Sequence, residues 1–258
     1  MIALQTIAVA FAMFSAVPVP QPVWNEKNMR YMLCAFPLIG VVIAAACELW
    51  LWLAGQVALS AFVRGAGLCL IPILITGGIH LDGYADTSDA LSSYSSPEKK
   101  QEILSDPHCG AFAVIRIAVY LIAMLSLCVQ LEPTRSAMLC LALAFVLSRS
   151  LSGFAIARFR MAKKTGLAHT FASSADKKRV RFILGVFVVL AAAALIAVGR
   201  LTGVCMVAAA LLVLWRYHAV AYKHFGGISG DLAGWFLQKA ELWMLAALVA
   251  CQLLEGIV

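Results

Sequence analysis

Three aspartates that share one side of a predicted helix are the residues of this chain best suited to chemistry: Asp82, Asp86 and Asp89. Their spacing of i, i+4 and i+7 puts the three carboxylates on one helix face. Like charges so placed repel one another, and a bound cation removes the repulsion. Carboxylate oxygens suit Mg²⁺, which keeps several waters and takes further ligands from substrate phosphates. We therefore expect all three to bind a catalytic Mg²⁺, the alternative being that Asp82 caps the helix and the other two are solvated.

A histidine and a pair of glycines come directly before the trio. The imidazole of His80 has an ordinary pKa of about 6.5, which suits removal of a proton from a hydroxyl. Because Mg²⁺ prefers oxygen ligands to imidazole, we expect His80 to serve in acid–base work or substrate contact. The alternative is a structural histidine. Gly77 and Gly78 lie beside it and are candidate substrate-binding residues.

A second glycine-rich stretch, Gly226-Gly227-Ile228-Ser229-Gly230, leads into Asp231 at the start of the last apolar run. Glycines let backbone N–H groups approach a phosphate closely, and a helix N-terminus favours anions. We expect Gly226 and Gly227 to contact substrate, and Asp231 to be a further metal ligand or base. The alternative for Asp231 is a plain N-cap of the helix that follows.

Arg149 lies late in the fifth apolar run, where a charge is costly and is usually paired or functional. A guanidinium can hold two phosphate oxygens at once, so we expect Arg149 to bind the substrate diphosphate. The structural alternative is an ion pair with one of the aspartates. Glu241, in the last apolar run, is expected to pair with Lys239 or Arg149.

The most basic loop runs from residue 158 to residue 181 and carries eight Lys and Arg residues against one acid, Asp176. Lys163 and Lys164, close to Gly166-Leu167, are the residues of this loop best placed to contact a nucleotide. Membrane topology alone, or contact with anionic lipid headgroups, also explains the basic loop. Arg116, five residues into the fourth apolar run, is expected to extend its side chain to the membrane interface.

The stretch from Gly77 to Asp89 carries the pattern Gly77-Gly78-x-His80-Leu81-Asp82-Gly83-x-Ala85-Asp86-x-x-Asp89. It resembles the signature of the cobalamin synthase family, the adenosylcobinamide-GDP ribazoletransferases. Further family-like pieces follow along nearly the whole chain: Pro18-Val19-Pro20, Phe36-Pro37-Leu38-Ile39-Gly40, Asp106 with Gly110, Ser148-Arg149, Gly166-Leu167, and Gly226-Gly227 with Gly230-Asp231. The chain departs from the family at four positions: Ala16, Ser105, His108 and Gln238. These departures concern an N-terminal basic residue and the Asp106 loop, and they leave the trio untouched.

The resemblance implies a reaction and its partners. A hydroxyl of α-ribazole, or of its 5′-phosphate, would attack the cobinamide-linked phosphorus of adenosylcobinamide-GDP and release GMP. It also implies that Asp106 contacts substrate. Two alternatives stay open. One is a membrane phosphotransferase of the CDP-alcohol type, whose pattern has Ala-Arg where this chain has Ala85-Asp86. The other is a cation- or proton-coupled transporter, although transporter acids usually lie near the midplane and these lie at run ends.

The composition places the chain among polytopic membrane proteins. Of its 258 residues, 63% are hydrophobic and 13% are charged, whereas soluble domains carry about 25% charged residues. No stretch of soluble composition is long enough to fold alone, so we expect one transmembrane domain over residues 1–258. The net charge of +7 is explained by basic loops and does not indicate nucleic-acid binding. The sequence leaves open whether the protein is an oligomer.

Eight apolar runs predict an all-α bundle of about eight transmembrane helices. They cover residues 2–17, 32–53, 66–81, 111–131, 136–157, 182–198, 203–222 and 232–254. Most approach the ~20 residues that span hydrocarbon. The first run is short, is stopped by Pro18, Pro20 and Pro22, and could form a re-entrant segment. It has no positively charged region before it, so we expect it to be retained and not to be a signal peptide.

The basic residues predict the orientation. The loop over 158–181 should be cytoplasmic, because Lys and Arg accumulate on that side. Alternation along eight spans then places fourteen Lys and Arg residues on the cytoplasmic side, Arg216 among them, and leaves Arg64, Arg135 and Arg200 outside. All candidate motifs fall on the cytoplasmic side. We therefore expect a multi-pass protein of the inner, cytoplasmic membrane, with both termini outside and the active site facing the cytoplasm.

Overall fold

The computed structural model describes residues 2–106, 108–162, 173 and 175–256. Within these ranges the regular structure is helical, apart from one isolated bridge between Met161 and Ile228. The predicted all-α bundle is confirmed. Its helices are α1 (Ile2–Phe14), α2 (Glu26–Met29), α3 (Met32–Gln56), α4 (Ala61–Thr76), α5 (Ile79–Ser92), α6 (Pro97–Ile103), α7 (Ala111–Gln130), α8 (Arg135–Arg158), α10 (Lys177–Gly199), α11 (Leu201–Phe225) and α12 (Gly230–Glu255).

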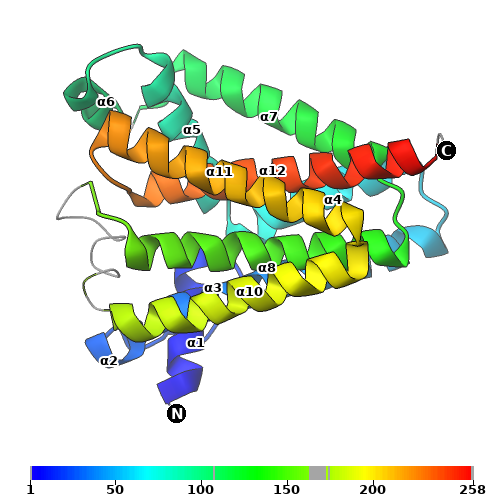
Figure 1. Ribbon diagram of the computed structural model, residues 1–258, viewed down its shortest axis with the longest axis horizontal. Helices are drawn as coiled ribbons and strands as arrows, with labels where there is room; N and C mark the ends of the chain where they lie inside the picture. The colour runs from blue at the N-terminus through cyan, green and yellow to red at the C-terminus, as the bar shows by residue number, and fades with distance from the viewer. Residues whose placement is uncertain (1, 107, 163–172, 174, 257–258) are drawn as a thin grey trace.

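The long helices lie side by side along the long axis of the molecule (Figure 1). Helix α8 is at the centre, since it packs against α3, α10 and α12 and is the most buried of the apolar helices. Small residues along α8, such as Ala144, Ser148, Ser152 and Gly153, let the neighbouring helices approach closely. The core of the bundle therefore forms around α8, and the helices that carry the aspartates are built onto it through α12.

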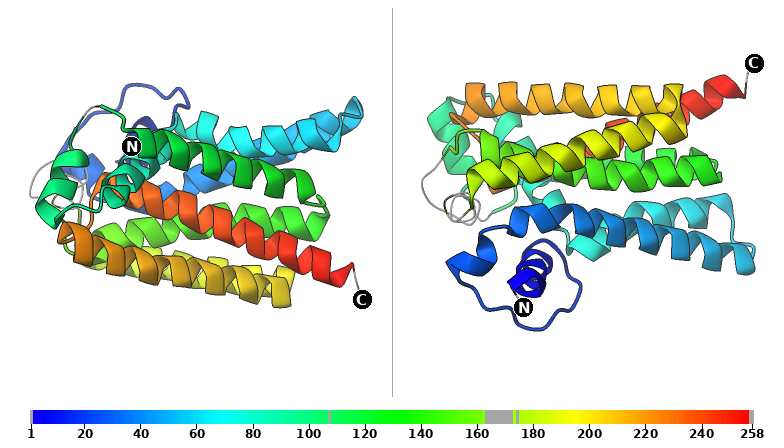
Figure 2. Two further views of the ribbon diagram at one scale, coloured as in Figure 1. Left: turned by 90° about the horizontal axis from the view of Figure 1, so that it is seen from above. Right: turned by 60° about the horizontal axis from the view of Figure 1, so that its bottom comes forward.

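The number of spans is smaller than the eight predicted. Six described helices are long and apolar enough to cross a membrane, and the bent pair α4–α5 brings the number to at most seven. The run at 2–17 forms α1, whose 13 residues extend only about 20 Å, short of the ~30 Å of a hydrocarbon core. Helix α1 lies across the bundle, and Figure 2 (right) looks along it while the long helices run across the view. With α1 not spanning, the chain has six or seven spans, and the side on which each terminus lies stays a prediction.

A pair of left-handed glycines breaks the predicted run at 66–81. Gly77 and Gly78 have φ values of 63° and 79°, which residues with a Cβ rarely adopt. Their N–H groups donate to the last carbonyls of α4, at Ile73 and Leu74, and so end the helix. The chain restarts as α5 at an angle of 94° to α4. Helix α5 therefore crosses one end of the bundle (Figure 1).

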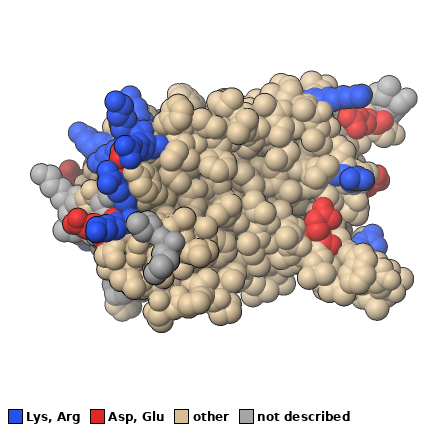
Figure 3. Space-filling model, turned by 90° about the horizontal axis from the view of Figure 1, so that it is seen from below, with Lys and Arg blue, Asp and Glu red and all other residues tan. Residues whose placement is uncertain are grey.

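The loops predicted to share one membrane side meet at the end of the bundle that carries α5. Arg30, after α2, forms an ion pair of 3.1 Å with Asp176, at the start of α10. Gln101 of α6 donates to the carbonyl of Phe225, the last residue of α11, at 2.8 Å. On the face that Figure 3 shows, Lys and Arg side chains crowd this end, and an uncharged band separates them from the charges at the other end. Such a band is the pattern expected of a membrane-spanning bundle.

Candidate active site

The three aspartates of α5 lie on one face of the helix, as their spacing predicts. Asp82 is exposed and Asp86 and Asp89 are half-buried, while the opposite side of α5 is buried in the bundle. Three other carboxylates lie close enough to Asp86 to repel its negative charge: Asp82, Asp89 and Asp231. The structure thus brings together four carboxylates from two helices, α5 and α12, that are far apart in the sequence.

Asp231 reaches the trio because α12 begins directly against α5. A Cβ at Gly83 would lie 2.7 Å from the Cα of Asp231, so only glycine permits this approach of the two backbones. The predicted alternative that Asp231 is an N-cap is wrong. Ser229 is the N-cap, since its Oγ accepts from the N–H of Leu232 at 3.2 Å, and Asp231 lies within the first turn. The serine hydroxyl lies 3.4 Å from a carboxylate oxygen of Asp231.

The four carboxylates form an open site of oxygen donors. The carboxylates of Asp82 and Asp86 make no hydrogen bond or ion pair with any residue that the structure describes. Within the same part of the chain, no group of three or more acidic, histidine or cysteine side chains is already placed so that it could hold a metal ion. An open set of carboxylates fits Mg²⁺, which completes its octahedral coordination with waters and phosphate oxygens. It fits a closed structural metal poorly.

His80 lies on the side of α5 away from the aspartates. Its side chain is buried, its ring meets the ring of Phe36 edge-on at 5.6 Å, and its Nε2 has no hydrogen-bond partner among the described residues. The carbonyl of His80 packs against Gly234 of α12. The structure therefore places the imidazole in the bundle interior, so its catalytic role stays a prediction.

Arg149 is also in the interior, where it pairs with Glu241. Its Nη1 donates to Oε1 of Glu241 at 2.7 Å and to the carbonyl of Phe145 at 3.1 Å, and the two charged side chains are 1% and 4% exposed. Ser148 donates to the same carboxylate oxygen at 3.0 Å. The expected pairing of Glu241 with Arg149 is confirmed. The expectation that Arg149 faces the diphosphate, or pairs with an aspartate, does not agree with this position.

The turn at Gly226-Gly227 is hydrogen-bonded to Arg160, just after the end of α8. The N–H of Ile228 donates to the carbonyl of Arg160 at 2.9 Å, and the guanidinium of Arg160 donates twice to the carbonyl of Gly226, at 2.7 and 3.1 Å. The stretch that leads toward Lys163 and Lys164 therefore starts beside this turn. Lys163 and Lys164 themselves lie outside the described residues.

Asp106 lies in the loop between α6 and α7. It is exposed and accepts from the backbone N–H of His108 at 2.9 Å and from its Nδ1 at 2.7 Å. These two hydrogen bonds hold the pKa of the Asp106 carboxyl below its usual range. Asp106 is not among the carboxylates that act on Asp86, so the structure keeps it outside the group of four.

Known proteins similar to this chain decide its family. A family model described as cobalamin-5-phosphate synthase matches residues 6–249. The chain belongs to this family. It is 42% identical over 255 residues to an adenosylcobinamide-GDP ribazoletransferase of Lachnoclostridium phytofermentans, covering 99% of this chain and 96% of the relative. No solved structure matches it.

More distant members of the cobalamin-5-phosphate synthase family carry the same name. A Geobacillus kaustophilus protein is 30% identical over 246 residues, covering 91% of this chain and 92% of its own length. A Clostridium perfringens protein is 28% identical over 237 residues, covering 92% of this chain and 94% of its own length. Both are named adenosylcobinamide-GDP ribazoletransferase. The matched region contains α5 and the start of α12, and it favours a transferase over the transporter and CDP-alcohol alternatives.

One role in this family member was missed by sequence reasoning. Asp89 accepts from the backbone N–H of Ala113 at 3.2 Å, in the first turn of α7. The N-cap residue of α7 is Gly110, which has no side chain to cap the helix, so Asp89 supplies the acceptor from another helix. The signal in the sequence is a predicted helix start whose N-cap position holds glycine. A glycine at this position shows that the helix lacks a capping side chain of its own. The sequence does not show which distant residue replaces that side chain.

Proposed function

We propose that this chain transfers the cobinamide phosphate of adenosylcobinamide-GDP to α-ribazole or its 5′-phosphate. The products would be GMP and adenosylcobalamin or its 5′-phosphate. The family and the names of its members support this reaction. The observation that carries it is the group of Asp82, Asp86, Asp89 and Asp231, which brings acidic oxygens from two helices to one end of a membrane bundle.

The reaction breaks a phosphoanhydride bond of adenosylcobinamide-GDP and forms a phosphoester bond to the ribazole hydroxyl. A ribazole hydroxyl oxygen forms a bond to the phosphorus attached to cobinamide, and the bond from this phosphorus to the bridging oxygen of GMP breaks. GMP leaves with the bridging oxygen. Asp231 stands on a different helix from the trio and is the residue we assign to accept the hydroxyl proton. The trio lies close to Asp231, on the other helix.

We propose that Asp82, Asp86 and Asp89 hold Mg²⁺. Bound Mg²⁺ would neutralise charge on the transferring and leaving phosphate oxygens. The fit rests on the absence of cationic partners for Asp82 and Asp86 among the described residues. Without a cation, four carboxylates so close together repel one another.

We place this end of the bundle in the cytoplasm and the protein in the inner membrane. The basic residues that flank α2, α6, α8 and α10 support this orientation, since Lys and Arg accumulate on cytoplasmic loops. Both substrates carry phosphate or sugar groups, which do not cross a bilayer unaided. An active face on that side meets them directly.

The test is GMP release by the purified protein in detergent, with adenosylcobinamide-GDP, α-ribazole and Mg²⁺. We expect GMP to appear only when α-ribazole or its 5′-phosphate is present, and chelation of Mg²⁺ to stop the reaction. Release of GMP at the same rate without an acceptor would indicate hydrolysis and contradict the proposed transfer. Comparing α-ribazole with its 5′-phosphate at equal concentrations identifies the preferred acceptor by kcat/KM.

A further inference from the structure

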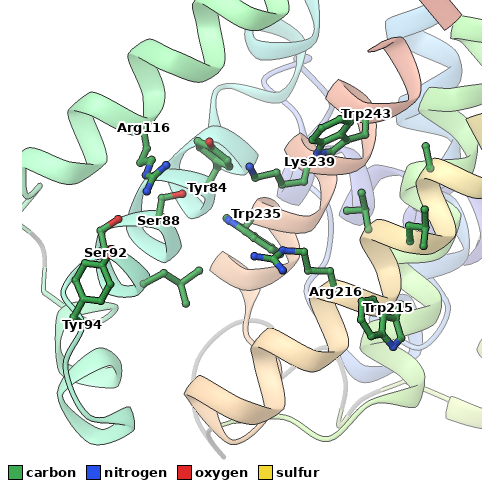
Figure 4. Close-up of a pocket in the computed structure, with 14 residues that line it drawn as sticks. Tyr84, Ser88, Ser92, Tyr94, Arg116, Trp215, Arg216, Trp235, Lys239 and Trp243 are labelled. Carbon is green, nitrogen blue, oxygen red and sulfur yellow. The ribbon is translucent and has the colours of Figure 1, made fainter. Parts of the chain in front are cut away.

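A cavity lies on the opposite side of α5 from the aspartates. It has a volume of about 690 Å³ and is bounded by α5, α7, α11 and α12 (Figure 4). Tyr84, Ser88 and Leu91 line it from α5. They repeat the trio's spacing two residues further on, and two residues turn a helix by about 200°. The cavity is therefore separated from the three aspartates of α5 by the thickness of that helix.

Three cations face this cavity without an anion. Arg116 of α7, Arg216 of α11 and Lys239 of α12 all line it, and their side chains point into the same opening (Figure 4). Both arginines lie close enough to Lys239 to repel its positive charge. The Nζ of Lys239 also lies 5.7 Å from the centre of the Tyr84 ring. None of the three forms an ion pair with a described residue. Cations inside spanning helices are costly unless paired, so the cavity is built to take an anion.

The cavity lies on the membrane-facing surface of the bundle. Trp215 and Leu212 of α11 are 70% and 65% exposed, and Trp243 of α12 is 53% exposed, whereas Trp235 at the back of the cavity is buried. Both helices are long and apolar enough to span a membrane, so their exposed apolar side chains face lipid. A ligand can therefore enter from the bilayer and pack an apolar group against Trp215 and Trp243.

The three cations lie at similar depths within their helices. Arg216 lies nine residues before the end of α11, and Lys239 lies nine residues after the start of α12. At 1.5 Å per residue both are about 13 Å from the helix ends next to the aspartates, and Arg116 is about 8 Å from its own helix start. Arg216 was counted on the cytoplasmic side, and it lies within α11. All three cations sit in the half of the bundle that carries the active face.

We propose that this cavity binds an anionic phospholipid. Its phosphate would lie among Arg116, Arg216 and Lys239, and its acyl chains would lie along Leu212, Trp215 and Trp243. The other ligand whose phosphate could bind the three cations is the nucleotide substrate. The lipid is favoured because the cavity opens toward the bilayer and is separated from the three aspartates of α5 by that helix. The proposal does not depend on the transferase reaction.

The first test measures lipid binding by native mass spectrometry and by the shift of melting temperature. The delipidated protein is titrated with phosphatidylglycerol or with phosphatidylcholine of the same acyl chains. We expect retention of phosphatidylglycerol and a higher melting temperature with it than with phosphatidylcholine. Arg216→Gln and Lys239→Gln should each weaken phosphatidylglycerol binding about fivefold. Lys223→Gln, on α11 but outside the cavity, should bind as the unsubstituted protein does.

The second test uses the unsubstituted protein, in case the variants do not fold. An amine-reactive reagent labels lysines, and peptide mass spectrometry follows Lys239 with Lys223 as the internal reference. Phosphatidylglycerol should protect Lys239 and leave Lys223 reactive. Equal effects of the two lipids, or equal protection of the two lysines, would overturn the proposal. Protection of Lys239 by adenosylcobinamide-GDP but not by phosphatidylglycerol would also overturn it, since the cavity would then belong to the nucleotide substrate.

Discussion

The buried pair of Arg149 and Glu241 should hold the bundle together, and Glu241→Gln tests this. The variant keeps the size of the side chain but removes the charge that lies 2.7 Å from Nη1 of Arg149. Both side chains are almost fully buried, so an uncompensated guanidinium would remain in the interior. Breaking a buried pair in this way costs about 3–5 kcal/mol of unfolding free energy. For a chain of this size, that loss lowers the melting temperature by about 6–20 °C.

The assay is thermal unfolding in detergent, with Glu132→Gln as the control. Glu132 is exposed at the far end of the bundle, and its carboxylate has no ion-pair partner among the described residues, so its variant should melt as the unsubstituted protein does. The double variant Arg149→Met/Glu241→Leu removes both charges and should recover much of the lost stability. An unchanged melting temperature for Glu241→Gln, together with a lower kcat/KM, would refute the structural role and return Arg149 to the substrate site.

Three further changes test the positions of the aspartates and the orientation. Asp89→Ala should lower the unfolding free energy by about 0.5–2 kcal/mol because Ala113 loses its capping acceptor, whereas Asp89→Asn keeps an acceptor and should melt normally; equal melting of the two would rule out the cap. Gly83→Ala should lower both the melting temperature and GMP release, because its Cβ would lie 2.7 Å from the Cα of Asp231; a fully active variant would contradict the close approach. A cysteine at Ser96 should react with an impermeant reagent only after the cells are opened, and labelling in intact cells would contradict the cytoplasmic orientation.

Features set by local sequence could be predicted. The spacing of Asp82, Asp86 and Asp89 is enough to place them on one helix face, and the structure places them there. The glycine-rich stretch before Asp231 indicated a helix start, and α12 begins at that stretch. Composition alone indicated a helical membrane bundle, because so few residues are charged.

Features set by contacts between distant segments could not be predicted. The partner of Arg149 is 92 residues away, and nothing in the local sequence distinguishes Glu241 from the aspartates as that partner. The role of Asp89 depends on where α7 begins in space. The run at 66–81 has the hydropathy of one span, but two left-handed glycines turn the chain by 94° before the run ends. The extra span was predicted at 2–17 because that run is apolar, although α1 is too short to cross.

The most direct test of the four-carboxylate site is GMP release by Asp86→Asn at saturating substrates and Mg²⁺. Asp86 is the residue on whose charge the other three carboxylates act, and it has no described cationic partner. We expect kcat to fall at least about 100-fold, since metal-bound phosphate chemistry depends on several kcal/mol of charge stabilisation and each 1.36 kcal/mol is tenfold. The melting temperature should be unchanged or higher, because the substitution relieves repulsion. Near-normal turnover by a folded Asp86→Asn protein, and equally by Asp82→Asn, would contradict the assignment of the active site to this face of α5.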